Sequence, residues 1–227
     1  LPAGWTWDAS DTVMTATGDQ TFKASYRDST GNYNDASNVD VTVHVSDKSD
    51  AKVAITSVPA SKTYGDASFA LTASAANAGT GTGVWTWTSS DPAVLEVTGS
   101  GATATVKILK ASETGVAITA RYESDTTLGA DVTAFIPVNK ATVTVAARNQ
   151  QIYVGGTAPD RTHPTQGTHY PVTGLVSGDA LGGTVSMEYQ TDGAAAAPDT
   201  AQAGAYDIVI SGVTEPTGGN YNPVVLT

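Results

Sequence analysis

Hydrophobic and polar residues alternate with a period of two along several stretches of this chain. Residues 39–45 read Val-Asp-Val-Thr-Val-His-Val, and residues 102–108 and 142–145 show the same alternation. Successive side chains of a β-strand point to opposite faces of a sheet, so the pattern predicts antiparallel strands with one buried face. No stretch sustains a helical period over about ten residues. The sequence therefore predicts an all-β fold.

Turn-forming residues separate the alternating runs. Gly, Asn, Asp, Ser and Pro cluster at 28–35, 77–83, 89–92, 98–101 and 215–222. These residues tolerate a positive φ, cap the backbone with short side chains or fix φ, and so favour turns. We expect short strands joined by tight connections.

Three recurring features divide the chain into modules. The four tryptophans lie in two copies of Trp-Thr-Trp, at 5–7 and 85–87. The other repeats are a glycine-led strand pattern at 18–26, 115–122 and 204–210 and the triplet Asn-Tyr-Asn at 32–34 and 220–222. They predict units at 1–47, 50–139 and 140–227, with a polar joint at 47–52. A small β-sandwich needs about 100 residues, so the first unit is expected to hold only the C-terminal strands of a module.

The motifs of each unit resemble repeats of bacterial, mainly Gram-positive, cell-surface proteins. Unit one, with LPAGWTWDAS, TFKASY and GNYN, resembles the end of such a repeat. Unit two, with KTYGD and TSSDPAV, resembles bacterial Ig-like repeats. Unit three, with GLVSGDAL, GAY and NYN, resembles the MBG-type module of surface adhesins.

This resemblance implies a fold, a location and a role. It implies tandem Ig-like β-sandwich modules, the first truncated, displayed outside a bacterial cell. It also implies a modular stalk or adhesin, whose partners are neighbouring modules of the same parent protein and a glycan or host surface protein. The family supplies no catalytic residues to carry over.

Charge and composition exclude several classes of partner. The chain carries 22 acidic and 11 basic residues, a net charge of −11, and no segment is basic. A surface that follows nucleic-acid phosphates is therefore not expected. The absence of cysteine excludes disulfides and thiolate zinc sites. No apolar run approaches the roughly 20 residues of a membrane span, so no membrane insertion is expected in what we take to be a fragment of a longer protein.

The tryptophan pairs are the main candidate for ligand binding. At strand spacing Trp5 and Trp7 share one face, and so do Trp85 and Trp87. Such a pair can stack on a sugar ring, but buried tryptophan is also common on the inner face of Ig-like sandwiches. Repetition favours the core interpretation. A stalk of repeated modules repeats its core residues, whereas a binding site needs to occur only once. Trp5 and Trp7 remain the candidate stacking pair, expected to be the least covered of the four.

Three further sites are open alternatives. His163 and His169 could bind a metal together with Asp160, although no helical or hairpin spacing supports such a site. The acidic segment 46–50, SDKSD, is the place where Ca²⁺ would bind. Some Ig-like surface domains carry a Lys–Asn isopeptide bond, for which Lys140 with Asn220 or Asn222 is the available pair.

No catalytic motif is present in the sequence. The chain has no G-x-S-x-G, no P-loop and no H-E-x-x-H, and GTGTG at 79–83 precedes a predicted strand and lacks the lysine of a phosphate loop. We therefore expect no enzyme and no required cofactor. The sequence predicts a non-catalytic extracellular stalk or spacer, with adhesion as a further role. A carbohydrate- or host-protein-binding module and accessory domains of a larger secreted hydrolase remain alternatives.

Overall fold

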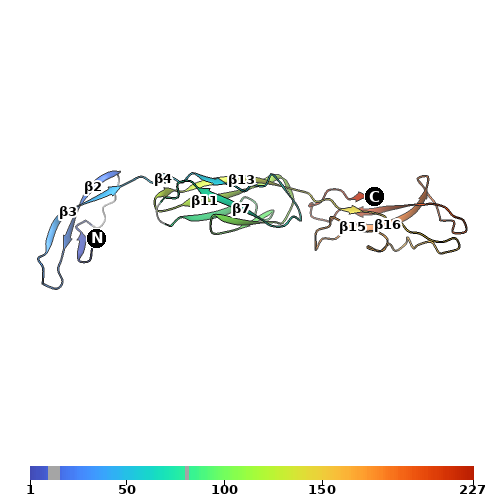
Figure 1. Ribbon diagram of the computed structural model, residues 1–227, viewed down its shortest axis with the longest axis horizontal. Coiled ribbons are helices and arrows are strands. Elements are labelled where there is room, and N and C mark those ends of the chain that lie inside the picture. Colours follow the sequence, from blue (N-terminus) through green and yellow to red (C-terminus); the bar gives the residue numbers. More distant parts are fainter. Residues whose placement is uncertain (10–15, 80–81) are drawn as a thin grey trace. The chain divides into compact units, whose positions relative to one another are not determined.

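The computed structural model describes residues 1–9, 16–79 and 82–227, and all regular elements in them are β-strands (Figure 1). The all-β prediction is confirmed. The chain forms two compact units. The first consists of Leu1–Ala51, Asn77–Gly83 and Glu123–Gly129, and the second of Lys52–Ala76, Val84–Tyr122 and Ala130–Thr227.

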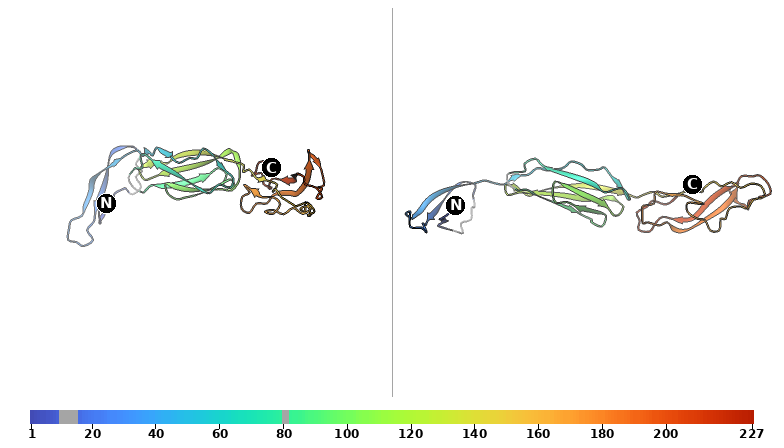
Figure 2. Two further views of the ribbon diagram at one scale, coloured as in Figure 1. Left: turned by 45° about the vertical axis from the view of Figure 1, so that its right-hand side comes forward. Right: turned by 60° about the horizontal axis from the view of Figure 1, so that its bottom comes forward.

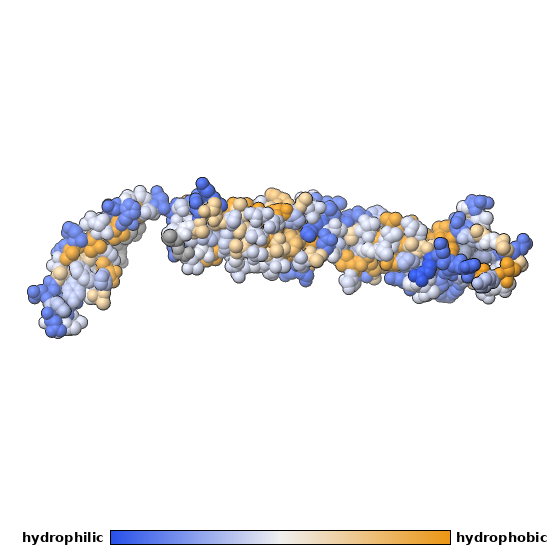
Figure 3. Space-filling model, viewed as in Figure 1, coloured by the Kyte–Doolittle hydropathy of each residue, from blue (hydrophilic) through white to orange (hydrophobic). Residues whose placement is uncertain are grey.

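The first unit contains a three-stranded antiparallel sheet, here called the N-terminal sheet. Its order is β1-β2-β3, from β1 (Trp5–Trp7), β2 (Gly18–Tyr26) and β3 (Ala36–Val45). The register places Trp5 opposite Tyr26, and Phe22 opposite Val41. One face therefore carries the tryptophans and the alternating valines. Ala24 is buried on this face, whereas Trp7 and Val39 remain 38% and 37% exposed, and hydrophobic residues reach the surface of this sheet (Figure 3).

A short parallel pair completes the regular structure of the first unit. It joins β4 (Ser49–Asp50) to β12 (Thr127–Leu128). The Ser49 N–H donates to the carbonyl of Thr126 at 3.1 Å, and Ala51 is fully buried. The segment 47–52, expected to be a polar joint, is thus partly strand, because its backbone finds partners in the residues around Thr127.

In the second unit, two four-stranded sheets enclose a hydrophobic core and form the central sandwich (Figure 2). One sheet has the order β5-β7-β10-β9, from β5 (Val53–Ile55), β7 (Phe69–Ala75), β10 (Thr103–Ile108) and β9 (Leu95–Thr98). The other has the order β6-β13-β11-β8, from β6 (Lys62–Thr63), β13 (Ala130–Asn139), β11 (Ser112–Glu123) and β8 (Val84–Ser89). Leu71, Leu95, Ile118 and Ile136 are fully buried between them.

Two three-stranded sheets form the C-terminal sandwich of the second unit. One has the order β15-β14-β19, from β15 (Val172–Thr173), β14 (Thr144–Val145) and β19 (Val225–Leu226). The other has the order β17-β16-β18, from β17 (Ala194–Ala195), β16 (Gly182–Thr191) and β18 (Asp207–Thr214). Val143, Val145, Met187 and Ile210 are buried in its core.

The two Trp-Thr-Trp copies occupy equivalent strands. Each copy lies on a strand, β1 or β8, next to the glycine-led strand of its sheet, β2 or β11. Trp5 packs on Tyr26 with ring centroids 5.7 Å apart, and Trp85 packs on Tyr122 at 4.9 Å. Trp87 is 7% exposed inside the central sandwich, and its indole N–H donates to the Gly101 carbonyl at 2.9 Å. The repeated-core interpretation of the motif accounts for these contacts.

The glycine-led strands differ in detail from the sequence prediction. β2 has the predicted bounds, but β11 begins at Ser112, before Gly115. Gly115 has φ +80 within a register shift, so a bulge lies where the strand was expected to start. β18 begins at Asp207 rather than at 204, which leaves Tyr206 outside the strand.

Candidate functional site

Two tyrosines and one aspartate from distant parts of the sequence meet where the central and C-terminal sandwiches adjoin. Tyr221 donates its hydroxyl hydrogen to Asp179 Oδ2 at 2.6 Å, and Tyr64 donates to the same oxygen at 3.0 Å. The two rings contact edge to face, with centroids 5.6 Å apart and planes at 80°. Aromatic pairs favour this geometry. We call these three residues the tyrosine–aspartate cluster.

Tyr64 is held at the end of β6 by local backbone bonds. The Tyr64 N–H donates to the Asn139 carbonyl at 2.9 Å, which continues the parallel pairing of β6 with β13. Asp66 Oδ2 accepts from the Thr63 N–H at 2.9 Å and fixes the turn that follows. In that turn Gly65 has φ +92, and a Cβ there would clash with Val176 Cγ2. Glycine is therefore required both by the backbone and by the close approach of the C-terminal sandwich.

Tyr221 is fixed from the side of the C-terminal sandwich. It forms a parallel bridge with Ala141 and is 3% exposed. Its hydroxyl oxygen also accepts from the Val176 N–H at 2.9 Å. The neighbouring Asn220 side chain reaches the central sandwich, where its Oδ1 accepts from the Ala111 N–H at 3.0 Å. Hydrogen bonds from the central to the C-terminal sandwich thus include those from Tyr64 to Asp179 and from Ala111 to Asn220.

The electrostatics of the cluster keep both phenols protonated at neutral pH. Burial, reinforced by the hydrogen bond to the Asp179 carboxylate, raises the pKa of Tyr221 to about 12. Burial and the same carboxylate raise the pKa of Tyr64. A general base works best when its pKa lies near the operating pH, so these phenols are poorly suited to proton abstraction. The arrangement is suited to holding two surfaces together.

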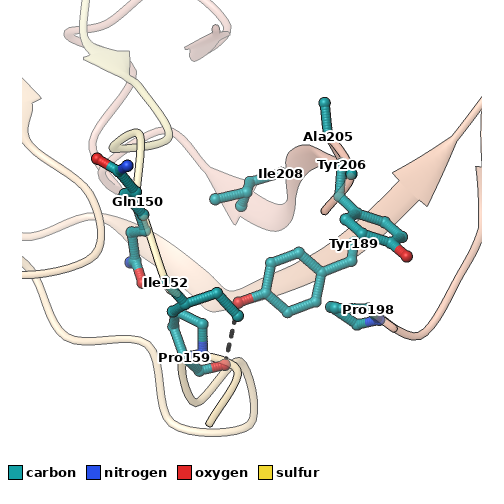
Figure 4. A pocket seen from close by; sticks show the side chains of 10 residues that line it. Gln150, Ile152, Pro159, Tyr189, Pro198, Ala205, Tyr206 and Ile208 are labelled. Atoms are coloured by element: carbon teal, nitrogen blue, oxygen red, sulfur yellow. Dashed lines mark hydrogen bonds between the residues drawn. The ribbon is translucent and has the colours of Figure 1, made fainter. Parts of the chain in front are cut away.

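A second feature of the C-terminal sandwich is an open cavity of about 300 Å³ (Figure 4). We call it the tyrosine groove, after the side chains of Tyr189 and Tyr206. Its remaining apolar lining includes Ile152, Pro159, Pro198 and Ile208, and its amides come from Gln150 and Gln151. The Tyr189 hydroxyl donates to the Pro159 carbonyl at 3.1 Å, and the Tyr206 hydroxyl accepts from the Asp199 N–H at 2.8 Å.

The lining of the tyrosine groove is neutral. Burial raises the pKa of the Tyr189 phenol, which stays protonated at neutral pH. The Arg161 guanidinium lies 5.8 Å from the centre of the Tyr189 ring, a cation–π contact. Pockets of this size stand at the small end of ligand sites, and aromatic walls with a few amides suit an uncharged ligand.

The candidate stacking residues Trp5 and Trp7 lie on one face of the N-terminal sheet, as predicted. Trp7 contacts Phe22 edge to face with centroids 6.0 Å apart, while Trp5 packs on Tyr26. Trp7 is 38% exposed, compared with 7% for Trp87. Both indoles therefore rest on aromatic side chains of their own sheet, and Trp7 presents part of its ring to solvent.

The structure brings together two of the three candidate metal ligands. His163 Nδ1 lies 3.3 Å from Asp160 Oδ2. Hydrogen bonds from Thr162 lower the pKa of Asp160 to about 2. His169 has another role, since its Nδ1 accepts from the Thr165 N–H at 2.8 Å. Within the described ranges, no three histidine or carboxylate side chains gather as metal ligands, at this loop or at 46–50.

The residues considered for an isopeptide bond make other contacts. Asn222 Nδ2 donates to the backbone carbonyl of Lys140 at 3.4 Å and to Thr142 Oγ1 at 3.2 Å. The Asn220 side chain accepts from the Ala111 N–H. Both amides thus meet groups other than the Lys140 amine, which is the nucleophile that this bond would need.

Sequence reasoning did not identify the tyrosine–aspartate cluster as a site. Its members are the tyrosine of Tyr-Gly-Asp at 64–66, the aspartate of Gly-Asp at 178–179 and the tyrosine of Asn-Tyr-Asn at 220–222. Each motif is recognisable alone in the sequence, but nothing in their spacing indicates that they meet. The tyrosine groove left no signal either, because its lining comes from irregular segments.

Comparison with known proteins leaves the family open. No family model and no curated protein matches the chain. Among solved structures it is similar to domains 4–9 of the surface layer protein SbsC, with 14% identity and a TM-score of 0.31. The likeness covers 93% of this chain and 35% of that one, so the chain spans about a third of its neighbour. None of the described residues forms a helix long and apolar enough to cross a membrane.

Proposed function

We propose that this chain is a non-catalytic, extracellular module array of a bacterial surface protein that acts as a stalk or spacer. The observation that carries the proposal is the tyrosine–aspartate cluster. A stalk holds its two ends at a fixed distance only if consecutive modules are rigidly joined to one another. Here Tyr64 from the central sandwich and Tyr221 from the C-terminal sandwich share one carboxylate oxygen of Asp179.

The surrounding contacts support this role. Gly65 admits Val176 at a distance that no side chain would permit, and Asn220 bonds to the backbone of Ala111. Interfaces between domains of one chain are often mobile unless they are large or apolar. An aromatic pair of which Tyr221 is buried, with hydrogen bonds to a charged carboxylate, restricts that motion. With no cysteine, the fold depends on hydrogen-bonded sheets and core packing and not on disulfides.

The stalk proposal is tested by measuring relative motion inside the second unit. Residual dipolar couplings of the full chain should fit one alignment tensor for both sandwiches. In Tyr64→Ala each sandwich should require its own tensor. The matched control is Tyr153→Ala, because Tyr153 is 83% exposed. Two independent tensors in the unaltered chain would refute a rigid spacer. Surface display is tested separately by labelling intact source cells with an antibody against the chain.

Ligand binding is a second candidate function, and the tyrosine groove favours it. Its neutral aromatic lining suits a glycan or an apolar stretch of a host protein. A glycan array probed with the full chain and with Tyr206→Ala separates the two functions. Binding that the variant loses supports a binding module, while an array without signal leaves the spacer role alone.

A further inference from the structure

A second open groove lies in the C-terminal sandwich and shares no lining residue with the tyrosine groove. Its volume is about 840 Å³, within the range of roughly 300–1,000 Å³ that is usual for small-molecule sites. The segments 162–166 and 180–185 line it, together with Tyr170, Leu175 and Asp179. We call it the threonine groove, after Thr162, Thr165 and Thr184.

The hydroxyl group of Tyr170 opens into this groove without a protein partner. The ring of Tyr170 packs in the core of the C-terminal sandwich, and the residue is only 8% exposed. Its hydroxyl group forms no hydrogen bond with any described residue. Within the described ranges no fully buried side-chain oxygen lacks a partner, so this hydroxyl is a part of Tyr170 that reaches solvent. Because Tyr170 lines the threonine groove, the hydroxyl reaches solvent there.

Core packing does not require a hydroxyl group at this position. Buried tyrosines usually pair their hydroxyl group with a partner in the protein, as Tyr189 and Tyr221 do here. Phenylalanine would fill the same space in the core and would leave no polar group without a partner. The Tyr170 hydroxyl is thus available to a molecule that enters the groove.

A carboxylate oxygen of the tyrosine–aspartate cluster is available in the same way. Tyr64 and Tyr221 both donate to Asp179 Oδ2, and no described residue donates to Asp179 Oδ1. The two tyrosines fix the carboxylate, so the position of Oδ1 is fixed as well. Hydrogen bonds to a charged acceptor are stronger than those between neutral groups. Asp179 therefore offers a strong acceptor to a ligand that donates O–H or N–H groups.

The groove is formed without a ligand. On the loop side, the His169 N–H donates to the Thr165 carbonyl, and the Thr165 N–H donates back to His169 Nδ1, both at 2.8 Å. On the side of β16, a register shift between Gly183 and Ser186 marks a bulge. Thr184 lies in this bulge, is exposed, and forms no side-chain hydrogen bond with a described residue.

The lining favours a ligand that is rich in hydroxyl groups and carries no negative charge. Among the described residues no lysine or arginine lines the groove, and His163 is paired with Asp160. An anion would therefore meet the Asp179 carboxylate without a compensating cation. A sugar ring carries hydroxyl groups at its rim and C–H groups on its faces, which suits a mixed lining. The apolar part of that lining includes Pro164, Leu175, Leu181 and Val185.

We propose that the threonine groove binds a neutral saccharide, with the Tyr170 hydroxyl and Asp179 Oδ1 as the groups that hold its hydroxyl groups. Gln166 and Thr184 supply further hydrogen bonds, and Leu181 contacts the C–H face of the sugar. This function goes beyond the spacer role and places a glycan at a site separate from the tyrosine groove. An open groove covers only part of its ligand, so each contact is weak and gains from several copies on one surface.

The test is a titration of the full chain, labelled with ¹⁵N, with glucose, galactose, mannose and N-acetylglucosamine in turn. At least one of these sugars should shift the backbone amide signals of Gln166, Asp179 and Thr184. Tyr170→Phe should weaken this binding roughly three- to tenfold, because one hydrogen bond is lost. Its melting temperature should equal that of the unaltered chain, because the hydroxyl has no partner in the fold.

Three further variants separate the groove from other sites. Thr184→Val removes an exposed hydroxyl at the bulge of β16 and should also weaken binding. Tyr33→Phe alters a ring that is 75% exposed and far from this groove in the sequence, and it should bind sugar normally. Tyr206→Ala, in the tyrosine groove, should bind sugar normally too.

Three outcomes would overturn the proposal. They are an absence of shifts with all four sugars, shifts that Tyr206→Ala abolishes, and a lower melting temperature for Tyr170→Phe. None of them bears on the spacer function, which the residual dipolar couplings test independently.

Discussion

Removal of one hydroxyl group, in Tyr221→Phe, should loosen the C-terminal sandwich and its junction with the central one. The phenylalanine ring fills the same space and keeps the edge-to-face contact with Tyr64. The variant loses the donor to Asp179 at 2.6 Å and the acceptor for the Val176 N–H at 2.9 Å. The substitution therefore isolates two hydrogen bonds at almost constant packing.

The size of the effect follows from these two bonds. A hydrogen bond to a charged group contributes about 1.5–3 kcal/mol, and a partly buried N–H left without its partner costs about 1 kcal/mol. The expected loss is about 2.5–4 kcal/mol of unfolding free energy. For a domain of the size of the C-terminal sandwich, this loss of unfolding free energy lowers the melting temperature by roughly 10–20 °C. Tyr64→Phe should cost less, because its bond to Asp179 is the longer of the two, at 3.0 Å.

Differential scanning calorimetry of the full chain measures this loss, and hydrogen exchange locates it. The chain has several folding units, so the transition of the C-terminal sandwich must be assigned before it is interpreted. Exchange should rise around Val176 and Tyr221. Tyr153→Phe removes a hydroxyl from an 83% exposed ring and serves as the matched control. A Tyr221→Phe variant with the same melting temperature as the unaltered chain would refute the structural role assigned to the cluster.

Alkaline pH offers an independent test of the same cluster. The folded pKa of Tyr221 is raised to about 12, above the ordinary tyrosine value of 10.0. The protonated phenol is thus favoured by the fold, and this stability is complete below about pH 10. It is lost as the pH rises from about 10 to about 12, while the unfolded chain ionises first. Tyr221→Phe should lack this contribution, and phenolate absorbance follows the titration.

Three further predictions concern other parts of the chain. Gly65→Ala should destabilise the junction by about 1–3 kcal/mol in thermal melts, because φ is +92 and its Cβ would meet Val176; Val176→Ala should restore only part of this. Hydrogen bonds from Thr30 and Tyr33 lower the pKa of Asp28 to about 2. The loop at 28–33 should therefore open as the pH falls from about 4 through about 2, and its hydrogen exchange should rise. Asp28→Ala should show this faster exchange already at neutral pH. Acrylamide should quench the fluorescence of a variant that keeps only Trp7 more than that of one that keeps only Trp87.

The fold class was predictable because period-two alternation is a local signal. The valines of 39–45 and the buried pair Ala104 and Val106 lie where alternation places them. The equivalence of the two Trp-Thr-Trp strands also followed from repetition alone. Strand starts were less predictable, since Gly115 reads as the residue before a strand but lies in a bulge inside one.

The candidate site was not predictable, because it depends on contacts between residues far apart in the sequence. The two Asn-Tyr-Asn motifs show the difficulty. Tyr33 is 75% exposed and Tyr221 is 3% exposed, although the three letters around them are the same. What separates them is the presence of Asp179 and Val176 beside one and not the other. A local motif cannot report which tertiary partner its side chain will meet.

The pairing of the first and last strands of the C-terminal sandwich bears on how it resists tension. β14 and β19 run parallel, and backbone hydrogen bonds extend the contact from Ala141 to Thr227. A pull between residues 140 and 227 draws these strands past one another lengthwise. All hydrogen bonds of the ladder are then strained together, instead of breaking one after another as in an unzipping hairpin. Resistance to forced unfolding depends on the unfolding rate. We expect shear loading to lower that rate, because several hydrogen bonds must break at the same time. We therefore expect the C-terminal sandwich to resist force applied between residues 140 and 227 more strongly than an unzipping hairpin would.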